Sequence, residues 1–238
     1  PSIYEFMLGF GGLAIAFIDA GQAEPMAYEA HIWAFGRVPT RTAQGAWHDF
    51  FNALIWLAFP RTKARLNALQ AGAIARAGVG AHRGGLRDAA TLFDENAALV
   101  IGGSGPWLSA WRRHDWSDVF AAQRQASAAW SPVLFGHALL DKLRSPYKAI
   151  CGHAWVVIDD ALADRFAAPA GPSVSDLVAL DTAVAGSLTE QTLSRRAFLP
   201  LPVLGVAGWW PDNARDGFYD DPAVFRPLPA AKAAARLT

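Results

Sequence analysis

The longest regular pattern of apolar and polar positions lies between Trp47 and Asn67. The apolar positions of its first part have the i, i+3, i+4, i+7 spacing of a helix that buries one side: Phe50, Ala53, Leu54 and Leu57. Pro60 lacks an N–H and clashes with the preceding turn, so it ends this helix near Phe59. Proline is also favoured at the first position of a helix. We therefore predict two helices joined by a sharp corner, the second extending to about Ala77.

Polar residues interrupt the first of these helices at its start. His48, Asp49 and Asn52 lie within about one turn, so they can share one surface. Asp49 could simply cap the helix, because a carboxylate satisfies free amides and complements the helix dipole. Alternatively, the three side chains form a small buried polar site. Lys63 and Asn67, one turn apart on the second helix, could point back towards them, so the trio gives our first candidate catalytic residues.

Candidate ligand-binding residues come from this stretch and from two later segments. They are tryptophans, cations and one amide: Trp56, Arg61, Lys63, Asn67, Arg87 and Trp209. Tryptophan suits a pocket because it combines a large apolar surface with one hydrogen-bond donor. Trp209 could cover such a pocket, although sealing of the hydrophobic core is the alternative interpretation.

A second informative stretch surrounds Asp94. The segments 91–93 and 97–101 have strand composition, and Asp94, Glu95 and Asn96 between them suit a hairpin turn. Asp94 could instead act as a general base or an acidic ligand at a strand end, so it is a further candidate catalytic residue. Arg87, just upstream, could pair with these acids.

A possible metal site is formed by His137, Asp141 and His153. We predict a helix from Ser131 to about Leu143, which places His137 and Asp141 on one face at i and i+4. That spacing suits two ligands of one metal, or a carboxylate that orients an imidazole. His137 is therefore both a candidate catalytic residue and a candidate ligand. His153 joins the set because it precedes a predicted strand, although a lone His-x3-Asp is common by chance.

The remaining pattern is mostly helical with a few short strands. We expect further helices at 107–113, 116–129, 161–166 and 174–188, a strand at 154–158, and a strand or short helix at 7–18. This order lacks the long strand–helix alternation of a doubly wound sheet. The prediction is an α+β, mainly α-helical single domain over residues 1–238, with a proline- and aromatic-rich irregular tail at 199–238 that wraps over the helices.

Composition narrows the classes of partner. Hydrophobic residues make up 53% of the 238 positions and charged residues 18%, which suggests a large core and an apolar patch suited to homo-oligomers. The 21 basic and 21 acidic residues balance, whereas nucleic-acid binders usually show a basic excess. The single cysteine excludes an internal disulfide and fits the cytoplasm. The apolar stretch at 7–18 is too short to span a membrane.

Four blocks in this order carry a resemblance to a known family: WHDFFNALIWLAFPRTKARLN, RDAATLFDEN, LFGHALLDKL and LPVLGVAGWWPDN. They resemble the bacterial family named domain of unknown function 3025, from about Tyr28 to Arg226. Ala207 departs from the proline expected before the glycine-tryptophan pair, so that loop should be less rigid. The resemblance implies a shared fold and a cytosolic bacterial protein, and it assigns no activity.

Three hypotheses about function follow. The first is a hydrolase-like enzyme with a site drawn from His48, Asp49, His137, Asp141 and His153. Neither a His-Glu-x-x-His zinc motif nor a Gly-x-Ser-x-Gly elbow is present, and no motif identifies a cofactor. The second is a module that binds a small molecule or a protein without catalysis. The third, nucleic-acid binding through the basic residues near Arg61, is disfavoured by the charge balance.

Overall fold

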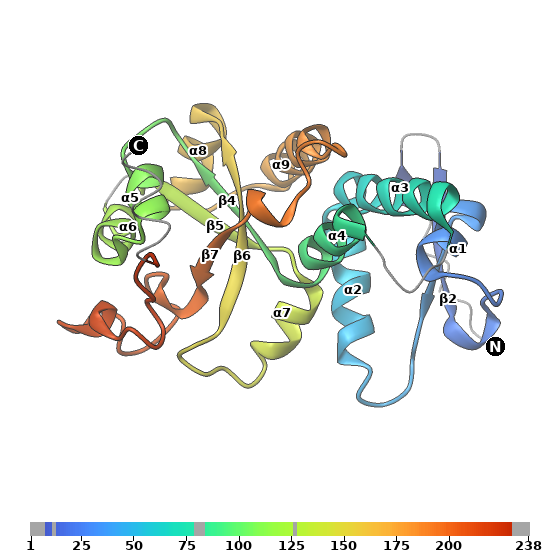
Figure 1. The fold of residues 1–238 in the computed structure, drawn as a ribbon, viewed down its shortest axis with the longest axis horizontal. Helices are drawn as coiled ribbons and strands as arrows, with labels where there is room; N and C mark the ends of the chain where they lie inside the picture. The colour runs from blue at the N-terminus through green and yellow to red at the C-terminus, as the bar shows by residue number, and fades with distance from the viewer. Residues whose placement is uncertain (1–7, 11–12, 79–83, 126–127, 230–238) are drawn as a thin grey trace. The chain divides into compact units, whose positions relative to one another are not determined.

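The computed structural model describes residues 8–10, 13–78, 84–125 and 128–229 (Figure 1). The chain divides into two compact units. Unit 1 comprises Pro1–Ala97, Phe135–Asp141 and Leu177–Ala197. Unit 2 comprises Ala98–Leu134, Lys142–Asp176 and Phe198–Thr238. Helices predominate, and the described strands form two small sheets, which confirms the predicted α+β, mainly helical class.

Unit 1 begins with a three-stranded sheet, and one helix connects two of its strands. Strand β1 (Leu8–Phe10) is antiparallel to β2 (Leu13–Asp19), and β2 is parallel to β3 (Arg37–Thr40). Helix α1 (Tyr28–Phe35) connects the two parallel strands. It ends at Gly36, which has a φ of +63° and donates its N–H to the Ile32 carbonyl. Glycine suits this left-handed position because it has no Cβ to clash.

The predicted helical corner is confirmed: α2 spans Trp47–Ala58 and α3 spans Pro60–Ala77. The start of α3 is capped from another helix, α9 (Val174–Ser187), by the Asp181 carboxylate. This carboxylate accepts hydrogen bonds from the backbone N–H groups of Arg61 (2.9 Å) and Thr62 (2.8 Å). The first backbone N–H groups of a helix have no acceptor within that helix, so the Asp181 carboxylate supplies the missing acceptors.

The predicted hairpin around Asp94 is wrong. Residues 84–96 form helix α4 (Gly84–Asn96), and β4 (Ala97–Gly102) follows directly. Ala89, Ala90 and Phe93 are fully buried at i, i+1 and i+4, so they form an apolar helix face. Burial of this helix face favours the helix more than the composition of residues 91–93 favours a strand. Asp94 consequently lies in the last turn of a helix that contacts α3, rather than at a hairpin tip.

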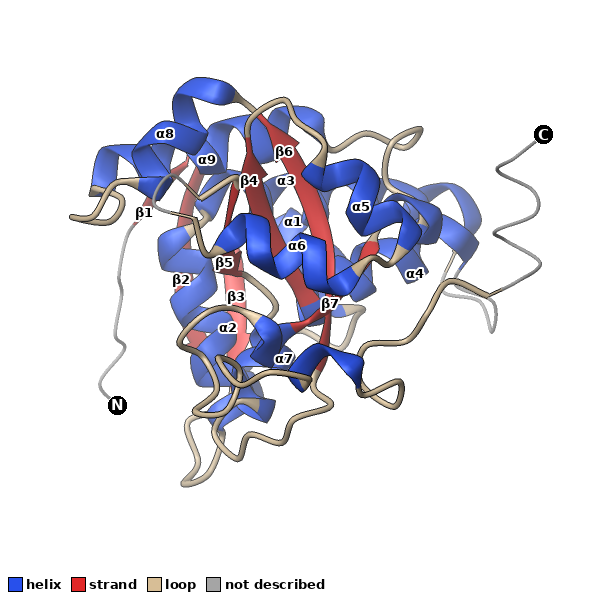
Figure 2. Ribbon diagram, turned by 90° about the vertical axis from the view of Figure 1, so that its left-hand side faces the viewer, coloured by secondary structure: helices blue, strands red, loops and turns tan. Residues whose placement is uncertain are grey.

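Unit 2 contains a four-stranded sheet in the order β5-β4-β6-β7 (Figure 2). The strands other than β4 are β5 (Trp130–Leu134), β6 (Cys151–Ile158) and β7 (Leu199–Pro202). The helix predicted from Ser131 is therefore wrong: the segment is strand β5, and only a short helix, α7 (His137–Lys142), follows. Pro132 is tolerated because β5 is an edge strand, where a missing N–H breaks no ladder.

The core of unit 2 is aromatic. Helices α5 (Trp107–Arg113), α6 (Trp116–Gln123) and α8 (Asp160–Ala167) complete the unit, α6 being shorter than predicted. Large buried aromatic side chains come from α5, α6, β5 and β6: Trp107, Trp111, Trp116, Phe120, Trp130 and Trp155. The segment after Leu199 is mostly irregular, with short 3-10 turns, and its Phe225 packs on Phe120. None of the helices in the described ranges has the length and hydropathy needed to cross a membrane.

Candidate functional site

A pocket in unit 1 gathers polar side chains from five helices. Its volume is about 340 Å³, within the range of small-molecule sites. The lining comes from α1, α2, α3, α4 and α7, together with Ala20 after β2, Pro39 in β3 and Arg41 after β3. All five candidate catalytic residues line it: His48, Asp49, Asn52, Asp94 and His137. Three of the candidate binding residues do so as well: Trp56, Lys63 and Asn67.

A buried lysine connects three elements of the pocket. Lys63 is only 3% exposed, and its Nζ donates to Asn52 Oδ1 at 2.7 Å and to Asp94 Oδ1 at 2.5 Å. The ammonium also lies 5.1 Å from the centre of the Trp56 ring, a cation–π distance. Burial lowers the pKa of Lys63, while the Asp94 carboxylate opposes that shift. Asn52 extends the network, because its Nδ2 donates to the Tyr28 hydroxyl at 2.8 Å.

Asp94 also lies near a pair of imidazoles that contact each other, those of His48 and His137. The Nε2 atoms of His48 and His137 are 3.1 Å apart, so one ring donates and the other accepts. The Nδ1 atom of His137 lies 3.9 Å from Asp94 Oδ2. His137 is 5% exposed, and burial lowers its pKa to about 4, with the neighbouring Lys63 charge acting in the same direction. His137 is therefore neutral at pH 7, close to a carboxylate on one side and to a second imidazole on the other.

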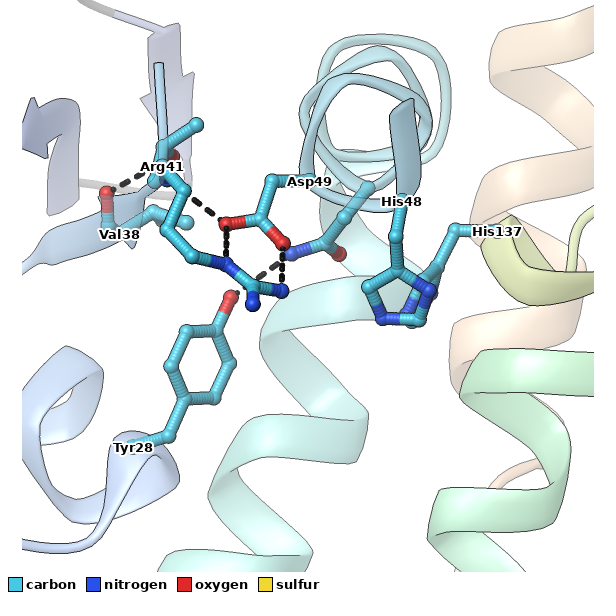
Figure 3. Close-up of polar contacts among 8 residues, drawn as sticks. Tyr28, Val38, Arg41, His48, Asp49 and His137 are labelled. Carbon is cyan, nitrogen blue, oxygen red and sulfur yellow. Dashed lines mark hydrogen bonds and ion pairs between the residues drawn. The ribbon is translucent and has the colours of Figure 1, made fainter. Parts of the chain in front are cut away.

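An ion pair holds the start of α2. The Arg41 guanidinium donates to both oxygens of Asp49, at 2.9 Å from Nε and 2.6 Å from Nη2, and the Arg41 backbone N–H donates at 2.7 Å (Figure 3). Hydrogen bonds from the guanidinium lower the pKa of Asp49. The carboxylate thus links α2 to the segment after β3, instead of capping its own helix. Because its oxygens are occupied, Asp49 fits a positioning role better than that of a base.

Several pocket residues were not among our candidates, and three of them matter for the proposals below: Tyr28, Arg41 and Gln70. Gln70 had a detectable signal, since it follows Lys63 and Asn67 at i+7 and i+3 on one face of α3. That face is buried and polar, which is unusual enough to mark a site. Tyr28 and Arg41 had no such signal, because their partners Asn52 and Asp49 are distant in sequence.

Five predicted residues do not line this pocket. The Arg61 side chain is exposed, Arg87 is buried within α4, and Asp141 follows His137 by one turn of α7. Trp209 and His153 belong to unit 2. Within the described ranges, no group of three or more His, Cys, Asp or Glu side chains is arranged to hold a metal. The metal set of His137, Asp141 and His153 remains a prediction.

Comparison with known proteins gives the family. The model of a family described as "Protein of unknown function (DUF3025)" matches residues 15–229, which is most of the chain. No curated protein and no solved structure matched. The family predicted from the four sequence blocks is thereby confirmed, and the chain belongs to the DUF3025 family.

Proposed function

We propose that the pocket of unit 1 is the active site of a hydrolase in which His48 acts as general base. The observation that carries this proposal is the pair of imidazoles, His48 and His137, joined at 3.1 Å with Asp94 behind them. Perturbed titratable groups that converge in a pocket are characteristic of catalytic sites. A cavity of about 340 Å³ supports a small-molecule substrate.

The neighbours of His137 define a proton arrangement. The Asp94 carboxylate lies 3.9 Å from Nδ1 of His137, beyond hydrogen-bond distance, and its negative charge favours a proton on that atom. Nε2 of His137 then carries a lone pair and accepts the Nε2–H of His48. This leaves Nδ1 of His48 as a free base. When His48 takes up a proton, the resulting charge is stabilised by the lone pair of His137 and, further away, by Asp94.

Water is the nucleophile that this lining supports. Neither serine nor cysteine is among the described residues that line the pocket, and its Thr91 hydroxyl makes no hydrogen bond to either imidazole. His48 would remove a proton from water while the water oxygen attacks an electrophilic carbon. The same proton then passes from His48 to the leaving group as the bond to that group breaks, so His48 returns to its starting state.

Negative charge develops on the substrate oxygen during the attack. Lys63 stabilises this charge through its positive potential, and Tyr28 does so as a neutral hydrogen-bond donor. Lys63 is held by Asn52 and Asp94, so its ammonium is already positioned when charge forms. The hydroxyl end of Tyr28 lies against Asn52, although more than a third of the residue is exposed. Burial of this end, reinforced by the Asp94 charge, raises the pKa of Tyr28, so the hydroxyl stays protonated and able to donate.

Hydrolysis of chromogenic esters and anilides by purified protein would test the proposal. His48→Gln should lower kcat/KM at least about 100-fold, the usual contribution of a general base. His114→Asn is the matched control, because it removes an imidazole from unit 2 at a position with φ +62° that asparagine tolerates. Hydrolysis that survives His48→Gln unchanged would contradict the assignment. Ligand binding without turnover would favour the alternative, a small-molecule-binding module.

His153→Gln belongs in the same assay because it separates the metal prediction from the proposal. Loss of activity in this variant, restored by added divalent metal, would favour a metal-dependent site. Our proposal predicts that His153→Gln leaves the hydrolytic activity unchanged. We also infer a cytoplasmic location from the single cysteine, and homo-oligomers from the high apolar content, both of which remain predictions.

A further inference from the structure

We propose that the pocket recognises a carboxamide, whose carbonyl accepts a hydrogen bond from Tyr28 and whose N–H donates to Gln70. The inference rests on the proposed function in one respect: the amide would be the bond that is hydrolysed. Recognition itself needs no turnover, so binding can be tested apart from catalysis.

Gln70 provides an acceptor that lacks a donor. The residue lies on α3, lines the pocket and is 5% exposed. Its Oε1 atom is shielded from solvent and has no hydrogen-bond partner among the described residues. Buried polar atoms are nearly always satisfied, so an exception beside a cavity points to a group that the cavity receives. A ligand N–H meets that requirement, whereas a carboxylate or phosphate oxygen would repel Oε1.

Tyr28 provides the complementary donor. Its hydroxyl oxygen accepts from Asn52 Nδ2, so the hydroxyl proton is directed elsewhere. No hydrogen bond donated by this hydroxyl is found in the part of the chain that the structure describes. Its raised pKa keeps the proton in place at neutral pH. A carbonyl oxygen is a suitable acceptor, and an amide combines such an oxygen with the N–H that Gln70 requires.

Charge in the pocket disfavours an anionic ligand. Each of its two basic residues is already paired with an acid, Arg41 with Asp49 and Lys63 with Asp94. Two further carboxylates line the pocket, Glu29 and Glu95, and no ion pair to either occurs among the described residues. A ligand carboxylate or phosphate would face this excess of negative charge without a free cation. A neutral amide would not be repelled by these carboxylates.

Three five-carbon probes test the proposal: glutaramide, glutarate and 1,5-diaminopentane, compared at equal ionic strength. Binding is followed by amide ¹H–¹⁵N chemical shifts of the full chain carrying His48→Gln, which prevents turnover. We expect glutaramide to shift the signals of α1 and α3, and glutarate to leave them unchanged at the same concentration. Equal or tighter binding of glutarate or of 1,5-diaminopentane would overturn the amide assignment.

Two variants locate the contacts. Tyr28→Phe and Gln70→Met should each weaken glutaramide binding roughly tenfold, the effect of one lost hydrogen bond. Tyr147→Phe, in unit 2 and 56% exposed, is the matched control and should not change binding. Gln70→Met should also raise the melting temperature, because it removes a buried unsatisfied acceptor. A Gln70→Met protein with a lower melting temperature and unchanged affinity would show that Gln70 is only structural.

The binding and hydrolysis results separate the two proposals. Glutaramide binding without hydrolysis of any substrate would retain the amide inference and refute the hydrolase. Hydrolysis that depends on His48, combined with no preference for glutaramide over glutarate, would retain the hydrolase and refute the amide.

Discussion

The interiors of the two units have different chemistry. Within the described ranges, unit 1 buries eight polar or charged side chains: His31, Thr62, Lys63, Asn67, Gln70, Arg87, His137 and Asp181. Unit 2 buries one, Asn213, in a core dominated by tryptophan and phenylalanine. Burying a polar group is unfavourable unless it is hydrogen-bonded, so such groups need a structural or functional reason. This contrast is one reason why we propose a functional site in unit 1.

The two units also differ in how completely their buried polar groups are satisfied. In unit 2, the Asn213 amide donates to the backbone carbonyls of Leu204 and Val206. In unit 1, the Asp181 carboxylate is satisfied by two helix amides, but Gln70 Oε1, Arg87 Nε and His137 Nδ1 have no hydrogen-bond partner among the described residues. The one buried polar residue described in unit 2 is therefore satisfied within the fold, whereas Gln70 in unit 1 is not.

The largest expected effect is in the aromatic core of unit 2. Trp111 is fully buried, and its Nε1 donates to the Pro200 carbonyl at 2.7 Å. Trp111→Ala should lower the free energy of unfolding by about 3–5 kcal/mol, because a large cavity and an unpaired carbonyl remain. Denaturant unfolding measures this loss. Trp209→Ala, at a position 36% exposed in the same unit, should change stability by less than about 1 kcal/mol.

The Lys63–Asp94 pair should show the next largest effect. Lys63→Met leaves the Asp94 carboxylate, 18% exposed, without its cation and should lower stability by about 2–4 kcal/mol. Adding Asp94→Leu should restore most of this stability, since an apolar pair replaces the ionic one. Activity and ligand binding should stay lost in the double variant. A double variant that is as unstable as the sum of both single variants would contradict this interpretation.

Acidification should destabilise the protein through His137. Its pKa is about 4 in the folded state, whereas the ordinary pKa of histidine, which the unfolded chain restores, is 6.5. The unfolded chain therefore binds more protons between these two values, and the free energy of unfolding should fall as pH decreases from about 7 to 4, by up to about 3 kcal/mol from this residue. His137→Gln should flatten this part of the stability–pH curve. Curves that remain parallel would show that His137 is not the cause.

The smallest effect is expected for the exposed ion pair at the start of α2. The Arg41 side chain is 66% exposed, so Arg41→Gln should lower stability by less than about 1 kcal/mol at moderate salt. Because Asp49 precedes Asn52 by less than a turn, the variant should weaken ligand binding more than it weakens folding. High salt should reduce the difference in stability between the wild type and Arg41→Gln. A large loss of stability would show that Arg41 and Asp49 are a folding determinant.

Local patterns were sufficient for some elements and insufficient for others. The corner at Pro60 could be predicted because proline geometry and apolar spacing are local properties. Helix α4 and strand β5 were missed, since neighbouring elements decide whether their apolar faces are buried as helix or strand. Sequence alone could not show the edge position that admits Pro132.

Candidate site residues were found where polar side chains interrupt an apolar helix, as His48 and Asn52 do. Tyr28 and Arg41 could not be found in this way, because their roles come from contacts with residues 24 and 8 positions away. Trp209 and His153 had plausible local settings but belong to the other unit. Residue type therefore gave the candidates, and only the tertiary structure shows which of them line one pocket.

The most direct measurement is the titration of the imidazole nitrogens of His48 and His137 by long-range ¹H–¹⁵N NMR. Our interpretation predicts that His137 stays neutral until about pH 4, with its proton on Nδ1, and that His48 carries its proton on Nε2. Asp94→Asn should alter both rings together. A His137 that titrates near 6.5, with a tautomer independent of His48 and Asp94, would contradict the proposed catalytic pair.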